Sequence, residues 1–380
     1  MPSLPPPILV TTPDELGQLA VELARHPRLG IDTESNSLHA FRERVCLVQI
    51  ATPEADYLVD SLAIQDLSPL APVMADTNIE KIFHAAEYDL LTLKRDHGFT
   101  FANLFDTMLA ARILARPKIG LGDLLAEEFN VEQSKKHQRA DWGKRPLDPA
   151  MLEYAQLDIH YLIPLSDQLK SQLMHAGRWP IAEEDFRRAA NVNGVGPGTP
   201  ELNIWRINGV RDLSPQQCAI LQKLAEYRYQ RAERADLPLF KIIGDKTLCA
   251  IAQSEPANAR ELRRVAGMTE VNVRRHGKAL LQAVKDGLQS APLYPPRRPA
   301  YDEPYHERLD ALKEWRKTRA RELQVESDII LPRDVMEDIA RRDPATLTDL
   351  SPAMYTIPWR HSQYAGDILA ALAALRTEQT

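Results

Sequence analysis

Residues 30–38 read GIDTESNSL, and this stretch places two carboxylates on a predicted strand at 29–34 that begins with apolar residues. On a strand, residues two apart face the same side, so the side chains of Asp32 and Glu34 should converge. Two carboxylates in a low dielectric repel each other and take up protons unless a cation lies between them. The pair therefore predicts a site for a divalent cation. Taken alone, the pair is more typical of a strand end that faces solvent than of a metal site.

Further carboxylates lie in two predicted helices. Residues 81–89, KIFHAAEYD, run from a strand into a helix and place Asp89 in its first turns. The Asp-Pro pair at 148–149 predicts a second helix start, with Asp as the N-cap. Tyr154 and Asp158 then share one face of that helix. Four carboxylates from one strand and two helices can hold two divalent metal ions, and hard oxygen ligands favour Mg²⁺ or Mn²⁺.

The first half of the chain alternates strand-like and helix-like runs. Strands are predicted at 7–11, 29–34, 45–51, 57–60 and 81–84, and helices at 13–26, 69–74, 86–97, 107–114, 121–129 and 149–173. Three closely spaced strands followed by alternating helices predict a mixed sheet with helices packed on it.

The second half has no convincing strand run, and it repeats itself. LQKLAEYR at 221–228 matches LDALKEWR at 309–316, an offset of 88 residues that also pairs Leu281 with Leu369. We therefore predict two copies of one small helical domain. Stretches rich in breaker residues predict two linkers, which divide the chain into domains at 1–190, 207–290 and 307–380 with linkers at 191–206 and 291–306.

Composition limits the classes of protein that fit. The chain has 380 residues, of which 44% are hydrophobic, enough for two or three cores. No apolar run approaches the roughly 18 residues that suggest a membrane span, and the first ten residues do not resemble a signal peptide. The three cysteines, Cys46, Cys218 and Cys249, lack a metal-type spacing. We expect a cytoplasmic protein with no membrane partner.

Charge is unevenly distributed along the chain. The net charge is -6, but residues 1–180 carry 17 basic and 25 acidic side chains, whereas residues 207–290 carry 14 and 9. The basic excess in the first helical repeat predicts a phosphate-binding face, and a solvated helix surface is the alternative. Its basic side chains are Arg260, Arg263, Arg264, Arg274, Arg275 and Lys278.

In order and setting, Asp32-x-Glu34, Asp89 and Tyr154-x-x-x-Asp158 resemble the three motifs of the DEDDy 3′–5′ exonucleases. Within that superfamily the chain most resembles ribonuclease D, and FDTMLAA at 105–111 and DWGKRPL at 141–147 are similar to that family too. Both repeats resemble HRDC domains. The resemblance implies a ribonuclease H-like α/β exonuclease domain, with a mixed sheet flanked by helices, followed by two small all-α HRDC domains.

The resemblance also implies a two-metal mechanism. Asp32 would bridge both ions, Glu34 and Asp158 would complete one site, and Asp89 would hold the second ion through water. Tyr154 would orient the attacking water, since a phenol of pKa about 10 is a poor base near neutral pH. The expected reaction releases nucleoside 5′-monophosphates from the single-stranded 3′ end of structured RNA, above all of tRNA precursors.

Several residues are predicted to contact the RNA. The resemblance implies that the backbone at Ser35 approaches the terminal 3′-OH and that Leu38 packs against the last bases. His84 could instead be a hydrogen-bonded core histidine, and the basic loop at 135–139 could be solvated. The full set is Ser35, Leu38, His84, Lys135, Lys136, Arg139, Arg263, Arg264, Arg274 and Arg275. Asp106 is expected to be a helix N-cap rather than a catalytic acid.

Two other functions fit the sequence. A DNA 3′–5′ exonuclease in repair is the first, because no residue here is recognised as reading a 2′-OH. A noncatalytic RNA-binding module is the second, although all four acids and the tyrosine are present. Protein partners are not predicted. Digestion of matched RNA and DNA oligonucleotides would separate the first from an exoribonuclease, and mononucleotide release on adding Mg²⁺ or Mn²⁺ would exclude the second.

Overall fold

The computed structural model describes residues 4–192, 198–296 and 301–378. Contacts divide these residues into two units. One unit contains 4–34, 45–192 and 301–378, and the other contains 35–44 and 198–296. Parts of both predicted linkers, 193–197 and 297–300, lie outside the described residues. Among the residues that are described, no helix is long and apolar enough to cross a membrane.

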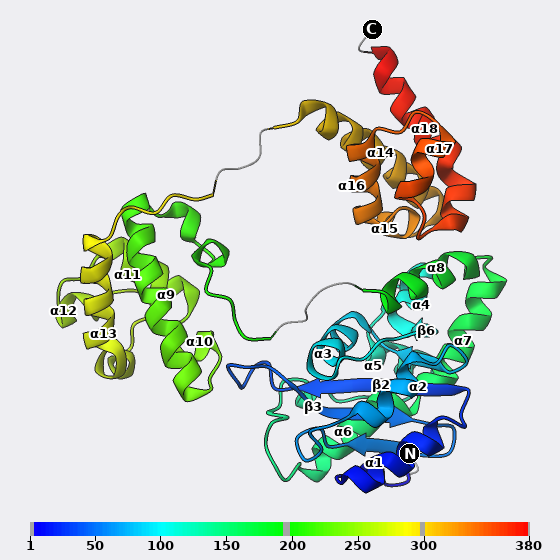
Figure 1. Cartoon of the computed structure of the whole chain (residues 1–380), viewed down its shortest axis with the longest axis horizontal. Helices are drawn as coiled ribbons and strands as arrows, with labels where there is room; N and C mark the ends of the chain where they lie inside the picture. Colours follow the sequence, from blue (N-terminus) through cyan, green and yellow to red (C-terminus); the bar gives the residue numbers. More distant parts are fainter. Residues whose placement is uncertain (1–3, 193–197, 297–300, 379–380) are drawn as a thin grey trace. The chain divides into compact units, whose positions relative to one another are not determined.

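A six-stranded sheet lies at the centre of the first unit (Figure 1), with strand order β1-β4-β3-β2-β5-β6. The strands are β1 Ile8–Val10, β2 Arg28–Ser35, β3 Val45–Ala51, β4 Asp56–Val59, β5 Glu80–Phe83 and β6 Leu104–Asp106. Three pairings are parallel, β1 with β4, β2 with β5 and β5 with β6, whereas β3 pairs with β4 antiparallel. The predicted mixed sheet is thus confirmed. The edge strand β6 was not predicted, because its last residue, Asp106, was interpreted only as the N-cap of the helix that follows.

Residues 4–192 contain eight α-helices. They are α1 Pro13–Leu23, α2 Ala71–Ala75, α3 Glu87–His97, α4 Thr107–Ile113, α5 Leu121–Phe129, α6 Pro149–His160, α7 Leu162–His175 and α8 Trp179–Ala190. The prediction of one helix over 149–173 is wrong, because the chain breaks between α6 and α7 at Tyr161. Pro164 explains the break: it has no N–H to donate to the carbonyl of His160, and its ring crowds that carbonyl.

The junction of α6 and α7 packs directly on β2 at Gly30. A Cβ at that position would lie 3.1 Å from the carbonyl oxygen of Ile159 and 3.1 Å from Cβ of Leu162. Only a residue without a side chain allows this approach without movement of the helices. Because Ile159 follows Asp158, the same contact sets the distance between the end of α6 and the strand that carries Asp32.

The predicted repeat is confirmed helix by helix. The first copy contains α9 Pro215–Ala235, α10 Leu239–Ile242, α11 Asp245–Ser254, α12 Ala259–Leu262 and α13 Glu270–Gln289. The second contains α14 Glu303–Leu323, α15 Ser327–Ile330, α16 Arg333–Arg342, α17 Leu347–Leu350 and α18 Pro358–Glu378. Every helix of the second copy begins 88 residues after its counterpart, as Pro215 and Glu303 illustrate. Even the left-handed residues after the first helices correspond, at Asp236 and Gln324.

The first repeat shares its core with residues 35–44, which we call the strap. The Phe41 side chain is 2% exposed and belongs to the same apolar cluster as the helices of this repeat. Its ring lies edge-on to Tyr229 at 5.0 Å, and its N–H donates to Oδ1 of Asp236 at 3.1 Å. The strap is therefore a packed part of the second unit.

The second repeat packs on α8 within the first unit. Arg360 is completely buried, and its guanidinium contacts Oε2 of Glu184 at 3.0 Å and Oδ2 of Asp185 at 2.8 Å. It also donates to the carbonyl oxygen of Ile329 at 2.9 Å. The Ile329 side chain lies in the same apolar cluster as Phe186 of α8. This interface combines a buried, hydrogen-bonded charge with apolar packing.

Candidate active site

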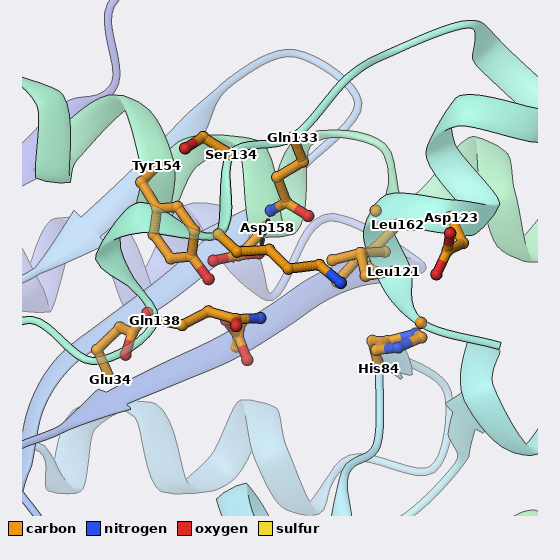
Figure 2. Close-up of a pocket in the computed structure, with 14 residues that line it drawn as sticks. Glu34, His84, Leu121, Asp123, Gln133, Ser134, Gln138, Tyr154, Asp158 and Leu162 are labelled. Atoms are coloured by element: carbon orange, nitrogen blue, oxygen red, sulfur yellow. Dashed lines mark hydrogen bonds between the residues drawn. The ribbon is translucent and has the colours of Figure 1, made fainter. Parts of the chain in front are cut away.

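Three carboxylates converge at one cavity. Carboxylate oxygens of Asp32 and Glu34 on β2 and of Asp158 on α6 lie within 4.8 Å of one another. All three side chains line a cavity of about 240 Å³, shown in Figure 2. The predicted convergence of a strand pair and a helical carboxylate is thus present in the structure.

Asp89 lies beside this cluster in the first turn of α3, where it is 6% exposed. Its carboxylate accepts a hydrogen bond from the hydroxyl of Thr33, and its charge contributes to raising the pKa of Asp32. The turn before α3 is unusual, since Ala85 has φ 62°. Asp106 holds that turn through the backbone N–H groups of Ala85 and Ala86, at 3.1 and 2.8 Å.

Asp106 also caps α4, as predicted. Its Oδ1 accepts from the backbone nitrogens of Met108 at 2.8 Å and Leu109 at 3.1 Å. One carboxylate therefore satisfies the first turn of α4 and the turn that leads into α3. Its contribution to the site is to hold the backbone that carries Asp89.

Burial disfavours the ionised form of every acid in the cluster, and repulsion between the acids adds to this effect at Asp32 and Glu34. Burial, followed by the charges of Asp89, Asp158 and Glu34, raises the pKa of Asp32 well above its usual range. Burial and the neighbouring acids raise the pKa of Glu34 to about 9. Burial likewise raises the pKa values of Asp89 and Asp158 to about 7. Without a cation the cluster retains protons near neutral pH, so it is a set of oxygen donors that a divalent metal ion would neutralise.

Tyr154 lies over the cluster on α6. Its hydroxyl donates a hydrogen bond to Asp158, and burial and the nearby acids raise its pKa. The phenol is therefore neutral and suited to orienting a water molecule, not to removing a proton. Its ring lies 6.1 Å from that of Trp142. Arg145 holds the loop that carries Trp142, through Asp60 at 2.6 Å and the carbonyl oxygen of Cys46 at 2.8 Å.

His84 both lines the cavity and is hydrogen-bonded by the protein. Its Nδ1 lies 2.9 Å from Oγ1 of Thr107, and that hydroxyl donates to the carbonyl oxygen of Phe83 at 3.1 Å. Because the hydroxyl proton is already used, Nδ1 must carry the hydrogen and Nε2 is an acceptor. Burial lowers the pKa of His84, which favours this neutral form.

The other predicted RNA contacts fall into three groups. Lys135 lines the cavity, and Lys136 and Arg139 are exposed on the same loop outside the lining. In the second unit the four predicted arginines of the first repeat are exposed, and Arg263 pairs with Glu270 at 3.0 Å. The remaining two residues, Ser35 and Leu38, are not in the cavity lining; Leu38 lies in the strap and is 41% exposed. All these contacts stay predictions.

Sequence reasoning missed more than half of the cavity wall. The unpredicted lining residues are Gly120, Leu121, Gly122, Asp123, Gln133, Ser134, Gln138 and Leu162. The glycines at the start of α5 were the available signal, since paired glycines often mark a close approach. No motif marks Gln133, whose side-chain amide donates a hydrogen bond to Oδ1 of Asp158.

The sheet and its acids indicate the class of protein. A mixed sheet carries clustered acids at the end of β2 and on α3 and α6, and a tyrosine lies one helical turn before the last acid. This is the arrangement of a 3′–5′ exonuclease. The sequence matches the family described as 3'-5' exonuclease over residues 7–174, and the HRDC domain over 217–284 and 306–372. The chain belongs to the ribonuclease D family of 3′–5′ exoribonucleases. Its fold is accordingly a ribonuclease H-like α/β domain followed by two all-α HRDC domains.

Individual relatives agree with this assignment. Ribonuclease D of Escherichia coli is 31% identical over 279 residues, which cover 73% of this chain and 74% of that protein. The crystal structure of Escherichia coli RNase D, described as an exoribonuclease involved in structured RNA processing, is similar to this chain with a TM-score of 0.67 and 25% identity. The similarity covers 97% of this chain and 99% of that chain. The exosome complex exonuclease RRP6 of Saccharomyces cerevisiae is 29% identical over 299 residues, 75% of this chain. This chain spans only 41% of that relative's length.

Proposed function

We propose that this chain shortens RNA from its 3′ end, one nucleotide at a time, and releases nucleoside 5′-monophosphates. The observation that carries the proposal is the convergence of Asp32, Glu34 and Asp158 at the cavity, with Asp89 and Tyr154 beside them. Clustered acids whose pKa values are raised by burial and by one another are the oxygen donors that divalent cations prefer.

The residues present fit two divalent ions, Mg²⁺ or Mn²⁺. Asp32, Glu34 and Asp158 would hold one ion, and Asp32 and Asp89 the other. When bound, such ions lower the pKa of water and stabilise the attacking and leaving oxygens of an in-line displacement.

The protein side chains supply orientation around the scissile phosphate. The neutral hydroxyl of Tyr154 would hold the attacking water, and Asp158 fixes that hydroxyl by accepting its hydrogen bond. Lys135 at the cavity would attract the phosphate. Nε2 of His84, as an acceptor, suits a hydrogen bond from a sugar hydroxyl.

Structured RNAs with short single-stranded 3′ tails, tRNA precursors above all, are the substrates we propose. Support comes from the exposed basic residues of the first HRDC domain, which suit the phosphates of an RNA body. Lys136, Arg139, Ser35 and Leu38 remain proposed contacts along the tail. We also propose a cytoplasmic location, which agrees with three cysteines that are free and buried. Cell fractionation would test it.

One digestion experiment tests the proposal. A tRNA precursor with an extended 3′ tail and a DNA oligonucleotide of the same tail sequence are incubated with Mg²⁺ or Mn²⁺, with and without chelator, and the products are weighed by mass spectrometry. We expect 5′-monophosphates and a ladder shortened from the 3′ end of the RNA, with none in chelator. Faster digestion of the DNA would favour the repair exonuclease instead. No digestion of either substrate would favour a noncatalytic RNA-binding module.

A further inference from the structure

Gln133 contacts one of the clustered carboxylates, although it is not an acid itself. Its side-chain nitrogen donates a hydrogen bond to Oδ1 of Asp158, and the residue lines the cavity (Figure 2). Asp158 also accepts from the Tyr154 hydroxyl. The carboxylate of Asp158 is thus held by two donors that approach from different segments, α6 and the loop between α5 and α6.

The loop that presents Gln133 is anchored close by. Asn130 ends α5 in the left-handed conformation at φ 54°, and Val131 is 5% exposed in the core. The Val131 N–H donates to the carbonyl oxygen of Leu125 at 3.2 Å. Gln133 therefore lies two residues after Val131, whose backbone and side chain are both held in place.

Space for the amide is provided by Gly122. A Cβ there would lie 3.3 Å from Oε1 of Gln133 and 3.6 Å from its Cβ, so any side chain at this position would press on the amide. The glycine at 122, which belongs to the cavity wall, thus leaves the room that the Gln133 side chain occupies. This fit between two chain segments is a second observation that the orientation of the amide is built into the fold.

We infer that Gln133 is a positioning residue for Asp158: its amide N–H holds one carboxylate oxygen so that the other is directed at the metal ion. The inference rests on the proposed metal-dependent function. A metal ligand binds its ion more tightly when the protein hydrogen-bonds the ligand atoms that do not contact the metal, because the ligand is then already oriented before the metal binds. The loss of such a hydrogen-bond donor typically costs about 10–100-fold in metal affinity or activity.

A different role for the same contact makes the opposite prediction. The amide hydrogens carry a partial positive charge, so Gln133 could occupy the place of a cation and compete with it. Removal of a positioning donor weakens metal binding, whereas removal of a competitor strengthens it. The direction of the change therefore separates the two roles.

The test is Gln133→Met, which keeps the length of the side chain and removes the donor. Mn²⁺ binding to the full chain is measured without RNA by electron paramagnetic resonance, and kcat and KM are measured on a tailed RNA over a range of Mn²⁺ concentrations. We expect the Kd for Mn²⁺ to rise about tenfold. We also expect kcat to recover at saturating Mn²⁺ while KM for RNA stays unchanged.

Glu132→Met is the matched control, because Glu132 is exposed, lies outside the cavity lining, and receives the same new side chain. It should bind Mn²⁺ as the unaltered chain does. Equal or tighter Mn²⁺ binding in Gln133→Met would overturn the inference, as would a lower melting temperature with an unchanged Mn²⁺ affinity. Failure of the unaltered chain to bind Mn²⁺ or degrade RNA would instead contradict the proposed function.

Discussion

Four acids and one phenol lie close together in this chain, and among the described residues no basic side chain lowers the pKa values of these acids. Burial alone disfavours ionised carboxylates, and their mutual repulsion adds to it, so Glu34 has a pKa of about 9. Such an arrangement costs folding free energy when no metal is bound. Residues that are unfavourable for stability and well placed for one ligand are typical of functional sites.

Asp32→Asn should lower kcat by more than about a hundredfold, since even residues behind the metal ligands contribute about 10–100-fold. The change removes a like charge from the cluster, so the metal-free variant should melt at the same or a higher temperature near pH 8. Mononucleotide release and thermal melting measure the two effects. Near-normal turnover in the folded variant would exclude Asp32 as a metal ligand.

Tyr154→Phe should slow turnover while leaving the metal ions bound. The ring keeps its place against Trp142, but the hydroxyl that donates to Asp158 is lost. We expect a lower kcat, by about 10²-fold if the hydroxyl positions the attacking water, with little change in Mn²⁺ affinity. Unchanged turnover would show that the water is oriented by another group.

The metal-free protein should lose stability as pH rises. Asp158 and Glu34 ionise near pH 4 in the unfolded chain, but in the folded chain their pKa values are about 7 and about 9. Between these limits the folded state binds more protons, so the free energy of unfolding falls with rising pH, by about 1.4 kcal/mol per pH unit for each proton difference. Melting in chelator should show the fall, and Mg²⁺ or Mn²⁺ should reduce it. A pH-independent melting temperature in chelator would contradict the electrostatic account.

The convergence of Asp32, Glu34 and Asp158 could be predicted from the sequence, because each of these acids lies in a local pattern. Asp32 and Glu34 are two residues apart on a strand, and Tyr154 and Asp158 four apart on a helix. Gln133 could not be predicted, because its loop has no periodicity and its contact with Asp158 depends on a tertiary approach. Patterns report residues on one element, whereas the cavity wall is assembled from several.

At the scale of elements, the approach of α6 and α7 to β2 at Gly30 is the packing contact nearest the site. Gly30→Ala should cost about 1–3 kcal/mol of stability, because the added Cβ would meet backbone as well as a side chain. It should also reduce kcat, since displacement of reacting groups by about 1 Å can cost about 10²-fold. Urea unfolding and RNA digestion measure both effects.

Gly17→Ala is the control for this change. Gly17 lies in α1, and a Cβ there would have no neighbour within 4 Å. Alanine in the interior of a helix is favoured over glycine by about 0.5–1 kcal/mol. The control should therefore gain stability and keep full activity. A Gly30→Ala protein that behaved like Gly17→Ala would show that the helices yield freely at this contact.

Elements with local signals were predicted and those without them were not. The N-caps at Asp106 and Asp148 were correct, since each side chain accepts from the first turn of its helix. The helix from 149 was continued too far, although Pro164 was the signal for a break. α8 was not predicted. Many of its residues are charged, and its apolar face is buried by contacts with distant parts of the chain that no local pattern indicates.

At the scale of the whole molecule, the buried Arg360 fixes the second HRDC domain to α8. Arg360→Ala should destabilise the chain by about 3–5 kcal/mol, because it leaves Glu184 and Asp185 without their cation. Urea unfolding of the full chain measures the loss. Arg341→Ala, which removes a side chain that is 66% exposed, should change stability by no more than about 0.5 kcal/mol. Equal effects of the two changes would show that the buried pair does not hold the interface.

The repeat could be read from the sequence because its offset is constant, and its helices follow that offset throughout. The different environments of the two copies could not be read from the sequence. Arg360 lies in the second copy, and its partners lie some 175 residues earlier in the chain. Nothing in its neighbourhood distinguishes it from a solvated arginine, because burial there depends on the docking of α8.

The strap also limits how relatives can exchange parts. Phe41 is buried in the apolar cluster of the first HRDC domain, yet in the sequence it lies within the region that matches the exonuclease family. A chimera in which residues 198–296 were replaced by the HRDC domain of another family member would place Phe41 of this chain against side chains that belong to the other protein. Substitutions at Phe41 and Tyr229 should therefore have to be inherited together, so that evolution of the two halves is not independent.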